Sequence, residues 1–278
     1  MEYYSPKSIK ELLELIDKYK VEAAIAAGCT DILVKQDFFK DKKAIIDITS
    51  IKELKNIESI GDKTRIGAGI TFSNLIQSKI IQQQHQALYQ AAKVYGSLQI
   101  RNRGTIAGNI VNASPAADSV PPLMVSNTKL ILLSKSGEEY ICIRDFFTGP
   151  GKTILKPEQI VAYIEIEKDN TDTISFYRKI GTRKALSIAK ASVAFKARKN
   201  NGRLTDVHFA YGSVGPTVIY SKSAREYLEG KALDNKIIEE VSLKAFDEVA
   251  PINDIRSTAE YRKLVVKNVL IEELKLFA

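Results

Sequence analysis

One short stretch holds most of the residues in this sequence that could bind a ligand. It runs from Arg101 to Asp118, contains Gly104 and Gly108, and is flanked by apolar runs rather than by a flexible linker. Glycine lets the backbone approach a ligand closely, and N–H groups exposed around glycines form concave anion sites. Small hydrogen-bonding side chains accompany these glycines at Thr105, Asn109, Asn112 and Ser114. The stretch predicts a polar loop that holds an anionic ligand.

A second turn of the same kind lies far upstream, at Gly28-Cys-Thr-Asp31. Apolar residues predict a buried strand over 23–27 before it and another over 44–48, and residues 32–39 predict a helical turn or two. This βαβ-like opening would place the turn at a helix N-terminus, where N–H groups and the helix dipole favour phosphate. Two such loops in one chain predict a long, phosphate-bearing ligand.

Composition narrows the possible functions. The 278 residues carry a net charge of +8, but Lys and Arg are scattered among Asp and Glu, which indicates a solvated surface and no nucleic-acid partner. Two cysteines, Cys29 and Cys142, are too few for an iron–sulfur cluster, which needs about four thiolates. No window approaches the roughly 20 apolar residues of a membrane helix, and the first residues lack a secretory pattern. We therefore expect a cytoplasmic protein without a membrane partner or a metal site.

Three familiar motifs are incomplete in this sequence. Gly67-Ala-Gly69 begins like a dinucleotide fingerprint, but Phe72 stands where the third glycine is required. Gly151-Lys-Thr153 resembles the end of a P-loop, but Phe146 replaces its first glycine and Pro157 interrupts the helix that should follow. No Gly-x-Ser-x-Gly elbow is present. Rossmann, NTPase and serine-hydrolase chemistry are therefore disfavoured.

The elements that must position the two loops fall on either side of a polar break at Lys168–Asp172. Ahead of it, apolar periodicity and turn signals predict helices over 8–19, 71–78 and 85–96, a hairpin over 57–68, and strands over 129–134, 139–143 and 160–166. Beyond it they predict strands over 174–179, 192–198 and 207–212, with a hairpin turn at residues 200–203, and helices over 224–228, 237–249 and 258–274. We expect one domain over 1–168, with subparts of about 1–55 and 56–168, and another over 172–278.

Three segments together resemble the FAD-binding subunit of molybdenum hydroxylases. They are Ala27–Asp31, Gln99–Asp118 and Gly149–Thr153, and they occur in the family's order across essentially the whole chain. The resemblance is strongest to bacterial xanthine dehydrogenase FAD-binding subunits and extends to carbon monoxide dehydrogenase medium subunits. It implies an α+β fold. A vanillyl-oxidase (PCMH)-type FAD-binding domain of two α/β parts would precede a small carbon monoxide dehydrogenase flavoprotein-like domain, with a three-stranded antiparallel sheet and helices.

The resemblance also implies which residues contact FAD. The first pyrophosphate loop would comprise Ile25, Ala26, Ala27, Gly28, Cys29, Thr30, Asp31 and Ile32, and the second Thr105, Ile106, Ala107, Gly108 and Asn109. Single contacts would come from Tyr95 (an aromatic contact near the flavin), Asp118 (a polar contact), Val161 (an apolar contact) and Lys179 (a cation at the flavin). The family often has glycine at the positions of Cys29 and Ala107.

Each single contact has an alternative without a ligand. Tyr95 could simply pack in the core, and Asp118 could cap a helix that starts near Val120. Lys179 could be a solvated charge or a member of an ion pair. If it lies near the N1/C2 edge of the flavin, its charge would favour the anionic reduced form.

By resemblance, the chain is an oxidoreductase subunit that does not itself oxidise the organic substrate. A molybdenum-cofactor large subunit would do so, a two-cluster [2Fe–2S] small subunit would pass electrons to FAD, and NAD⁺ would be the usual acceptor. Two alternatives remain open: a flavin-free binding or assembly module of the same fold, and a flavoprotein with a different electron donor. The sequence does not name the organic substrate, because that pocket belongs to another chain.

Overall fold

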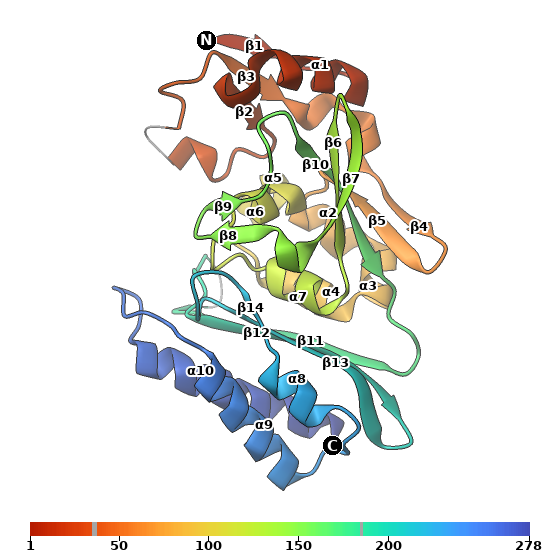
Figure 1. Cartoon of the computed structure of the whole chain (residues 1–278), viewed down its shortest axis with the longest axis vertical. Coiled ribbons are helices and arrows are strands. Elements are labelled where there is room, and N and C mark those ends of the chain that lie inside the picture. Colours follow the sequence, from red (N-terminus) through yellow and green to blue (C-terminus); the bar gives the residue numbers. More distant parts are fainter. Residues whose placement is uncertain (35–37, 184–185) are drawn as a thin grey trace.

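The N-terminal part is a small parallel sheet. The computed structural model describes residues 1–34, 38–183 and 186–278. Strands β1 (Glu2–Tyr4), β3 (Ala44–Asp47) and β2 (Ala23–Ala26) form a three-stranded sheet in the order β1-β3-β2, and both pairs are parallel. This part lies at the top of Figure 1. The parallel pairing of β2 and β3 agrees with the predicted βαβ-like opening, but the described residues of the connection between them, 27–34 and 38–43, form no α-helix.

Helix α1 (Ile9–Tyr19) begins where the sequence predicts. The Ser8 hydroxyl accepts the Glu11 N–H at 3.2 Å, whereas the Glu11 carboxylate accepts the N–H of Lys7 at 2.8 Å. In a standard capping box the glutamate side chain accepts the N–H of the N-cap residue, here Ser8. In this helix the Glu11 carboxylate accepts the N–H of the preceding residue, Lys7, instead.

A five-stranded antiparallel sheet forms the second part. Its order is β4-β5-β10-β6-β7, with β4 (Ile57–Ile60), β5 (Lys63–Gly67), β10 (Ile160–Glu167), β6 (Lys129–Ser134) and β7 (Gly137–Cys142). Helices α2 (Phe72–Gln77), α3 (Lys79–Gln84) and α4 (Gln86–Val94) follow the first hairpin, and α7 (Val120–Val125) precedes β6. Strands β8 (Phe147–Gly149) and β9 (Lys152–Thr153) form a separate hairpin.

The stretch expected to be a polar loop is largely helical, which corrects the sequence-based interpretation. It forms α5 (Leu98–Arg103) and α6 (Ile106–Val111), and only the residues between and after them are irregular. Side chains cap both helices: the Ser97 hydroxyl accepts the Ile100 N–H, and the Thr105 hydroxyl accepts the Gly108 N–H. Such caps stabilise short helices even when glycine is present.

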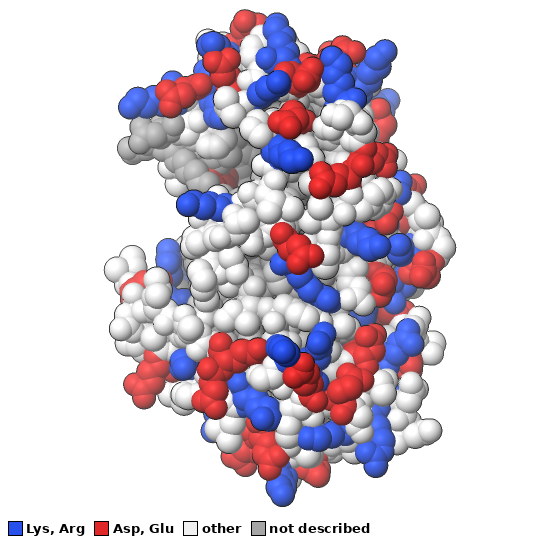
Figure 2. All heavy atoms as spheres, in the orientation of Figure 1, with Lys and Arg blue, Asp and Glu red and all other residues white. Residues whose placement is uncertain are grey.

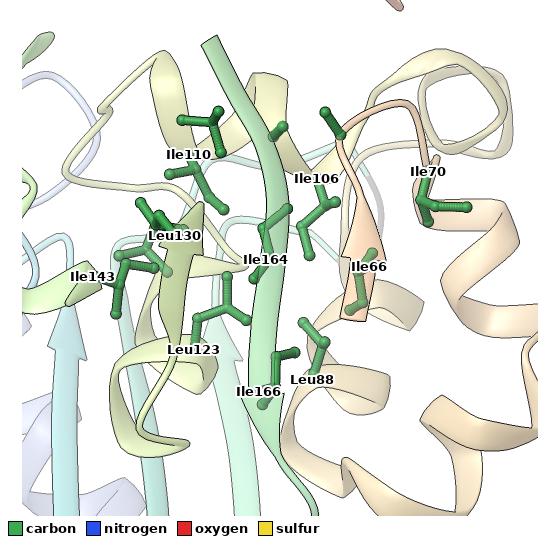
Figure 3. Packing of buried hydrophobic residues seen from close by; sticks show 14 of the residues in the cluster. Ile66, Ile70, Leu88, Ile106, Ile110, Leu123, Leu130, Ile143, Ile164 and Ile166 are labelled. Atoms are coloured by element: carbon green, nitrogen blue, oxygen red, sulfur yellow. The ribbon is translucent and has the colours of Figure 1, made fainter. Parts of the chain in front are cut away.

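The hydrophobic core of this part is organised around β10, the central strand of the sheet. Figure 3 shows Ile164 and Ile166 of β10 among side chains from neighbouring strands and helices, including Ile66 of β5 and Leu123 of α7. Because Ile106 of α6 belongs to the same fully buried cluster, the core fixes the helix that carries the second glycine loop.

The C-terminal part is a four-stranded antiparallel sheet with helices on one face. Strands β11 (Thr173–Ile180), β12 (Ala191–Asn200), β13 (Arg203–Gly212) and β14 (Ile219–Tyr220) lie in that order, followed by α8 (Ser223–Leu228), α9 (Asn235–Glu248) and α10 (Ala259–Leu274). The three expected strands are present, and the two-residue β14 adds a fourth. The predicted hairpin turn has Asn201 and Gly202 both at positive φ, as a type I′ turn requires.

Helices α4 and α7 join this sheet to the rest of the molecule. They contact β11, β12 and β13 on the face opposite α9 and α10 (Figure 1). Lys and Arg are interspersed with Asp and Glu over the face in Figure 2. None of the helices in the described ranges is both long and apolar enough to cross a membrane.

Candidate cofactor site

A cavity of about 710 Å³ lies where the two glycine loops meet. The loop after β2 and the N-terminal turn of α6 supply much of its lining, and β10 and the segment after β11 supply further walls. In Figure 2 the left side of the molecule is hollowed between its N-terminal part, at the top, and its C-terminal part, at the bottom. All the predicted contacts line this cavity except Ala26, Ile106 and Lys179. Ala26 and Ile106 are buried in the core, at 5% and 0% exposure.

The two loops pack against each other backbone to backbone. A Cβ atom at Gly28 would lie 1.8 Å from the carbonyl oxygen of Arg103, a contact that no side chain can make. Gly28 is therefore needed because it lets the second loop pack closely against the first. Its effect on the shape of the cavity follows from that packing.

Cys29 adopts a backbone conformation that favours glycine. Its φ is +57°, in the left-handed region, which costs a residue other than glycine roughly 1 kcal/mol. Its thiol donates to the Ala27 carbonyl at 3.6 Å, and burial raises the pKa of the thiol. Glycine at this position would remove the strain, which accounts physically for the family's preference.

Among the described residues, the first loop leads into a 3₁₀ turn and not an α-helix, which corrects the prediction of a phosphate site at a helix N-terminus. Ile32–Val34 form one 3₁₀ turn, and residues 35–37 of the expected helix lie outside the described part of the chain. One turn carries little of the aligned peptide dipole that makes a helix N-terminus attractive to anions. Any anion binding by this loop must therefore depend on local N–H groups.

The second loop is fixed at the start of α6. The Ile106 N–H donates to the Ile70 carbonyl at 3.0 Å, and the Gly108 N–H donates to the Thr105 hydroxyl at 3.1 Å. Between them, the Ala107 N–H has no acceptor among the described residues. A Cβ atom at Gly108 would contact only the Thr105 hydroxyl, at 2.9 Å. The loop thus presents a donor and an open space on the cavity side.

Asn109 links helix α6 to the segment that follows it through hydrogen bonds to Ser119. Its Oδ1 atom accepts the Ser119 hydroxyl at 2.7 Å and the Ser119 N–H at 3.3 Å. This pair of bonds ties α6 to the segment that carries Asp118. The oxygen of Asn109 is thereby occupied, and what the side chain can offer to a ligand is its NH₂ group.

Tyr95 both packs on the protein and lines the cavity. Its ring stacks on Phe72, with 3.6 Å between ring centroids and 10° between the planes. Burial raises the pKa of Tyr95 to about 12, so its hydroxyl stays protonated at neutral pH. The stacking fixes the orientation of the ring at the cavity wall.

Asp118 lies in a buried polar cluster, and the alternative in which it caps a helix is wrong. Ser119 occupies the N-cap position of α7, and no side chain caps that helix. The two carboxylate oxygens of Asp118 accept instead from the Tyr177 hydroxyl at 2.8 Å and from Lys179 Nζ at 2.7 Å. Burial raises the pKa of Asp118, and the Lys179 ammonium opposes that rise.

Lys179 forms the ion pair that the sequence left as an alternative. Its side chain is 6% exposed, and it does not line the cavity, whereas Asp118 does. Burial raises the pKa of Tyr177 well above its ordinary value, so Tyr177 acts as a donor. Sequence reasoning missed Tyr177, although it lies two residues before Lys179 on a predicted strand, where alternation places both side chains on one face.

Several cavity residues carried no sequence signal. Val161 was expected, and its neighbour Ile160 also contributes to the cavity wall. The other unpredicted lining residues include Phe38, Ala68, Gly96, Ile100, Leu155, Leu186 and Ile188. Most are apolar, as is usual for the wall of a cofactor site.

Comparison with known proteins identifies the family. Residues 1–167 match the family described as the FAD binding domain in molybdopterin dehydrogenase, and residues 176–275 match the carbon monoxide dehydrogenase flavoprotein C-terminal domain. The chain belongs to the FAD-binding subunits of molybdenum hydroxylases. It is therefore an FAD-dependent oxidoreductase subunit.

Individual relatives support this assignment across nearly the whole chain. The xanthine dehydrogenase FAD-binding subunit of Escherichia coli O157:H7 is 31% identical over 89% of this chain and 86% of its own length. The nicotinate dehydrogenase FAD-subunit of Eubacterium barkeri is 30% identical over 96% of this chain and 93% of its own length. A solved carbon monoxide dehydrogenase chain from Hydrogenophaga pseudoflava superposes with a TM-score of 0.94 at 27% identity, covering 99% of this chain and 96% of that one.

The residues present are compatible with FAD. The cavity combines apolar walls with the Ala107 N–H donor and the buried carboxylate of Asp118, and Gly108 leaves space where a side chain would intrude. A dinucleotide offers matching chemistry, because it has a phosphate acceptor, an apolar ring system and ring or hydroxyl donors.

Proposed function

We propose that this FAD-binding subunit transfers electrons from the iron–sulfur clusters of a partner subunit to NAD⁺ or another acceptor. The observation that carries the proposal is one cavity lined by both glycine loops and by Asp118, whose carboxylate Lys179 holds from behind the wall. Bound FAD supplies the redox chemistry, because it accepts electrons singly and releases a pair as hydride. The residues of this chain bind and orient the cofactor.

We assign phosphate binding to the start of α6. The Ala107 N–H has no acceptor among the residues that the structure describes, and Gly108 next to it carries no side chain that would cover it. The contact between Gly28 and Arg103 holds the first loop against the second, so both can face one pyrophosphate. Ile106 anchors this arrangement in the core, which makes its role supporting rather than direct.

We assign polar recognition to Asp118 and apolar packing to Tyr95 and Val161. Tyr177 and Lys179 donate to Asp118 and keep it available as a charged acceptor at the wall. A donor group of the cofactor would complete its hydrogen bonding. Lys179 therefore acts through Asp118, and because its charge is already countered there, it is not a free cation for the reduced flavin.

We propose a molybdenum-cofactor large subunit and a two-cluster [2Fe–2S] small subunit as partners. The support comes from relatives named as FAD-binding subunits or medium chains, among them those of xanthine, nicotinate and carbon monoxide dehydrogenases. Xanthine is the first substrate to test because xanthine dehydrogenase subunits are among the most similar relatives, and nicotinate is the second.

The test is electron delivery to the purified chain. The protein should carry FAD at one equivalent, and its flavin absorption should bleach when a chemically reduced two-cluster iron–sulfur subunit is added without oxygen. A colourless protein that cannot be loaded with FAD would favour the flavin-free assembly module. A flavin that stays oxidised with this donor, yet is reduced by another, would favour the alternative electron donor.

A further inference from the structure

A second cavity, of about 600 Å³, lies beside the cofactor cavity. The two share Ala27, Gly28, Ile48 and Thr105, but most of the second lining comes from other elements. These are the 3₁₀ turn Lys52–Lys55, the start of β4, the segment from Gly69 to the end of α2, and the end of α5. None of these additional residues was predicted to contact FAD.

Two amide side chains of the lining, Asn74 and Asn102, offer hydrogen-bond donors to a ligand. Asn74 uses its side-chain oxygen to accept the Thr71 N–H at 3.1 Å and the Thr71 hydroxyl at 2.8 Å. Asn102 uses its oxygen to accept the Ser73 hydroxyl at 2.6 Å. With both oxygens occupied, each amide offers a ligand only its NH₂ group.

Two cations add to these donors. Lys55 reaches the cavity over Gly69, where an added Cβ atom would lie 3.5 Å from Lys55 Cγ. Arg103 is the second cation in the lining, and its backbone carbonyl packs against Gly28. Within the described ranges, no Asp or Glu lines the cavity. The nearby Asp47 accepts the Thr49 N–H and the Tyr3 hydroxyl, both at 2.8 Å. Burial opposes ionisation of Asp47, but these hydrogen bonds and the positive charge of Arg103 lower its pKa, so part of the Arg103 charge is shared with Asp47.

We propose that this cavity binds a phosphate-bearing small molecule of nucleotide size, separately from FAD. Two cations and two amide NH₂ groups match the acceptor oxygens of a phosphate, and a guanidinium can bind such oxygens in pairs. Ile48, Ile57 and Ile70 form an apolar wall suited to a base or sugar face. The volume falls in the range of small-ligand sites, about 300–1,000 Å³.

The proposal is tested by titrating the FAD-saturated chain with ADP, inorganic phosphate and adenosine in a calorimeter. ADP should bind at one equivalent, phosphate should compete more weakly, and adenosine should not bind measurably. Arg103→Gln and Lys55→Gln should each weaken ADP binding roughly tenfold or more, since each removes a charge-assisted hydrogen bond. Lys52→Gln is the matched control, because Lys52 lies on the same turn outside the cavity lining.

Three results would overturn the proposal. They are no ADP binding, ADP binding that survives both cavity variants, and ADP binding by the FAD-free protein that disappears on FAD loading. The last would assign this cavity to the cofactor itself. Flavin content and melting temperature are measured for every variant, and Lys55→Gln decides the outcome if Arg103→Gln proves unstable because of its place at the loop contact. The assay follows nucleotide binding and is independent of electron transfer to partners.

Discussion

Removing Lys179 tests whether Asp118 is held at the cavity wall as a charged group. The two side chains are 6% and 7% exposed, and their charged atoms are 2.7 Å apart. Loss of one member of a buried ion pair costs about 3–5 kcal/mol, because the other charge remains buried without compensation. We expect Lys179→Met to lower the free energy of unfolding of the FAD-free protein by about that amount at pH 7.

Neutralising both members should undo much of this loss. In the double variant Asp118→Asn, Lys179→Met no uncompensated charge remains, so its unfolding free energy should exceed that of Lys179→Met alone. The residual deficit would reflect lost hydrogen bonds, at about 1 kcal/mol each. Urea unfolding of the wild-type chain, both single variants and the double variant provides the complete cycle.

The loss of unfolding free energy in Lys179→Met should depend on pH, in a direction that follows from the pKa of Asp118. Burial raises the pKa of Asp118, and removing Lys179 should raise it further. A carboxyl with a higher pKa in the folded state favours folding at low pH, and this contribution is lost as the pH rises through the folded-state pKa. The deficit of Lys179→Met relative to wild type should therefore be smallest near about pH 4 and grow toward neutrality. A deficit that is independent of pH, or additive single-variant losses in the double variant, would refute a buried charge pair.

Three further substitutions probe the cofactor site. Asp118→Ala should weaken FAD binding by about tenfold to a hundredfold in a flavin fluorescence titration, since a charge-assisted hydrogen bond is worth about 1.5–3 kcal/mol; unchanged affinity would remove Asp118 from the contacts. Gly108→Val should leave a folded protein by circular dichroism but abolish flavin retention, because an added Cβ would displace only the Thr105 hydroxyl, 2.9 Å away, at a position that lines the cofactor cavity. Stoichiometric FAD in that variant would mean that the pyrophosphate lies elsewhere. Cys29→Gly should raise the unfolding free energy by up to about 1 kcal/mol through relief of its left-handed conformation, and a lower melting temperature would contradict that strain.

Local signals in the sequence predict many of the elements correctly. The Asn-Gly turn at 201–202 specifies the β12–β13 hairpin through positive φ at both residues. Ser8 marks the start of α1 through its hydroxyl. The α5–α6 stretch was missed because its glycines suggest a loop, while the caps at Ser97 and Thr105 and burial of Ile106 stabilise helices.

The parts of the site that depend on distant contacts could not be predicted in the same way. Gly28 contacts Arg103 through backbone atoms, and only the folded chain shows that contact. Asp118 was found from the resemblance, but its role depends on Tyr177 and Lys179, which strand β11 supplies from about 60 residues further along the chain. Strand alternation places those two side chains on one face of β11, yet nothing in the sequence states what that face meets.

The most direct test of the central claim is reconstitution of the complete electron path. The purified FAD-loaded chain is mixed with a two-cluster iron–sulfur subunit and a molybdenum subunit of a xanthine dehydrogenase, and NADH formation from xanthine is followed by absorbance. We expect turnover only when all three chains are present, and its loss when this chain is replaced by Gly108→Val. Oxidation of xanthine by this chain alone, or full NADH formation by the other two chains without it, would contradict its role as the flavin subunit.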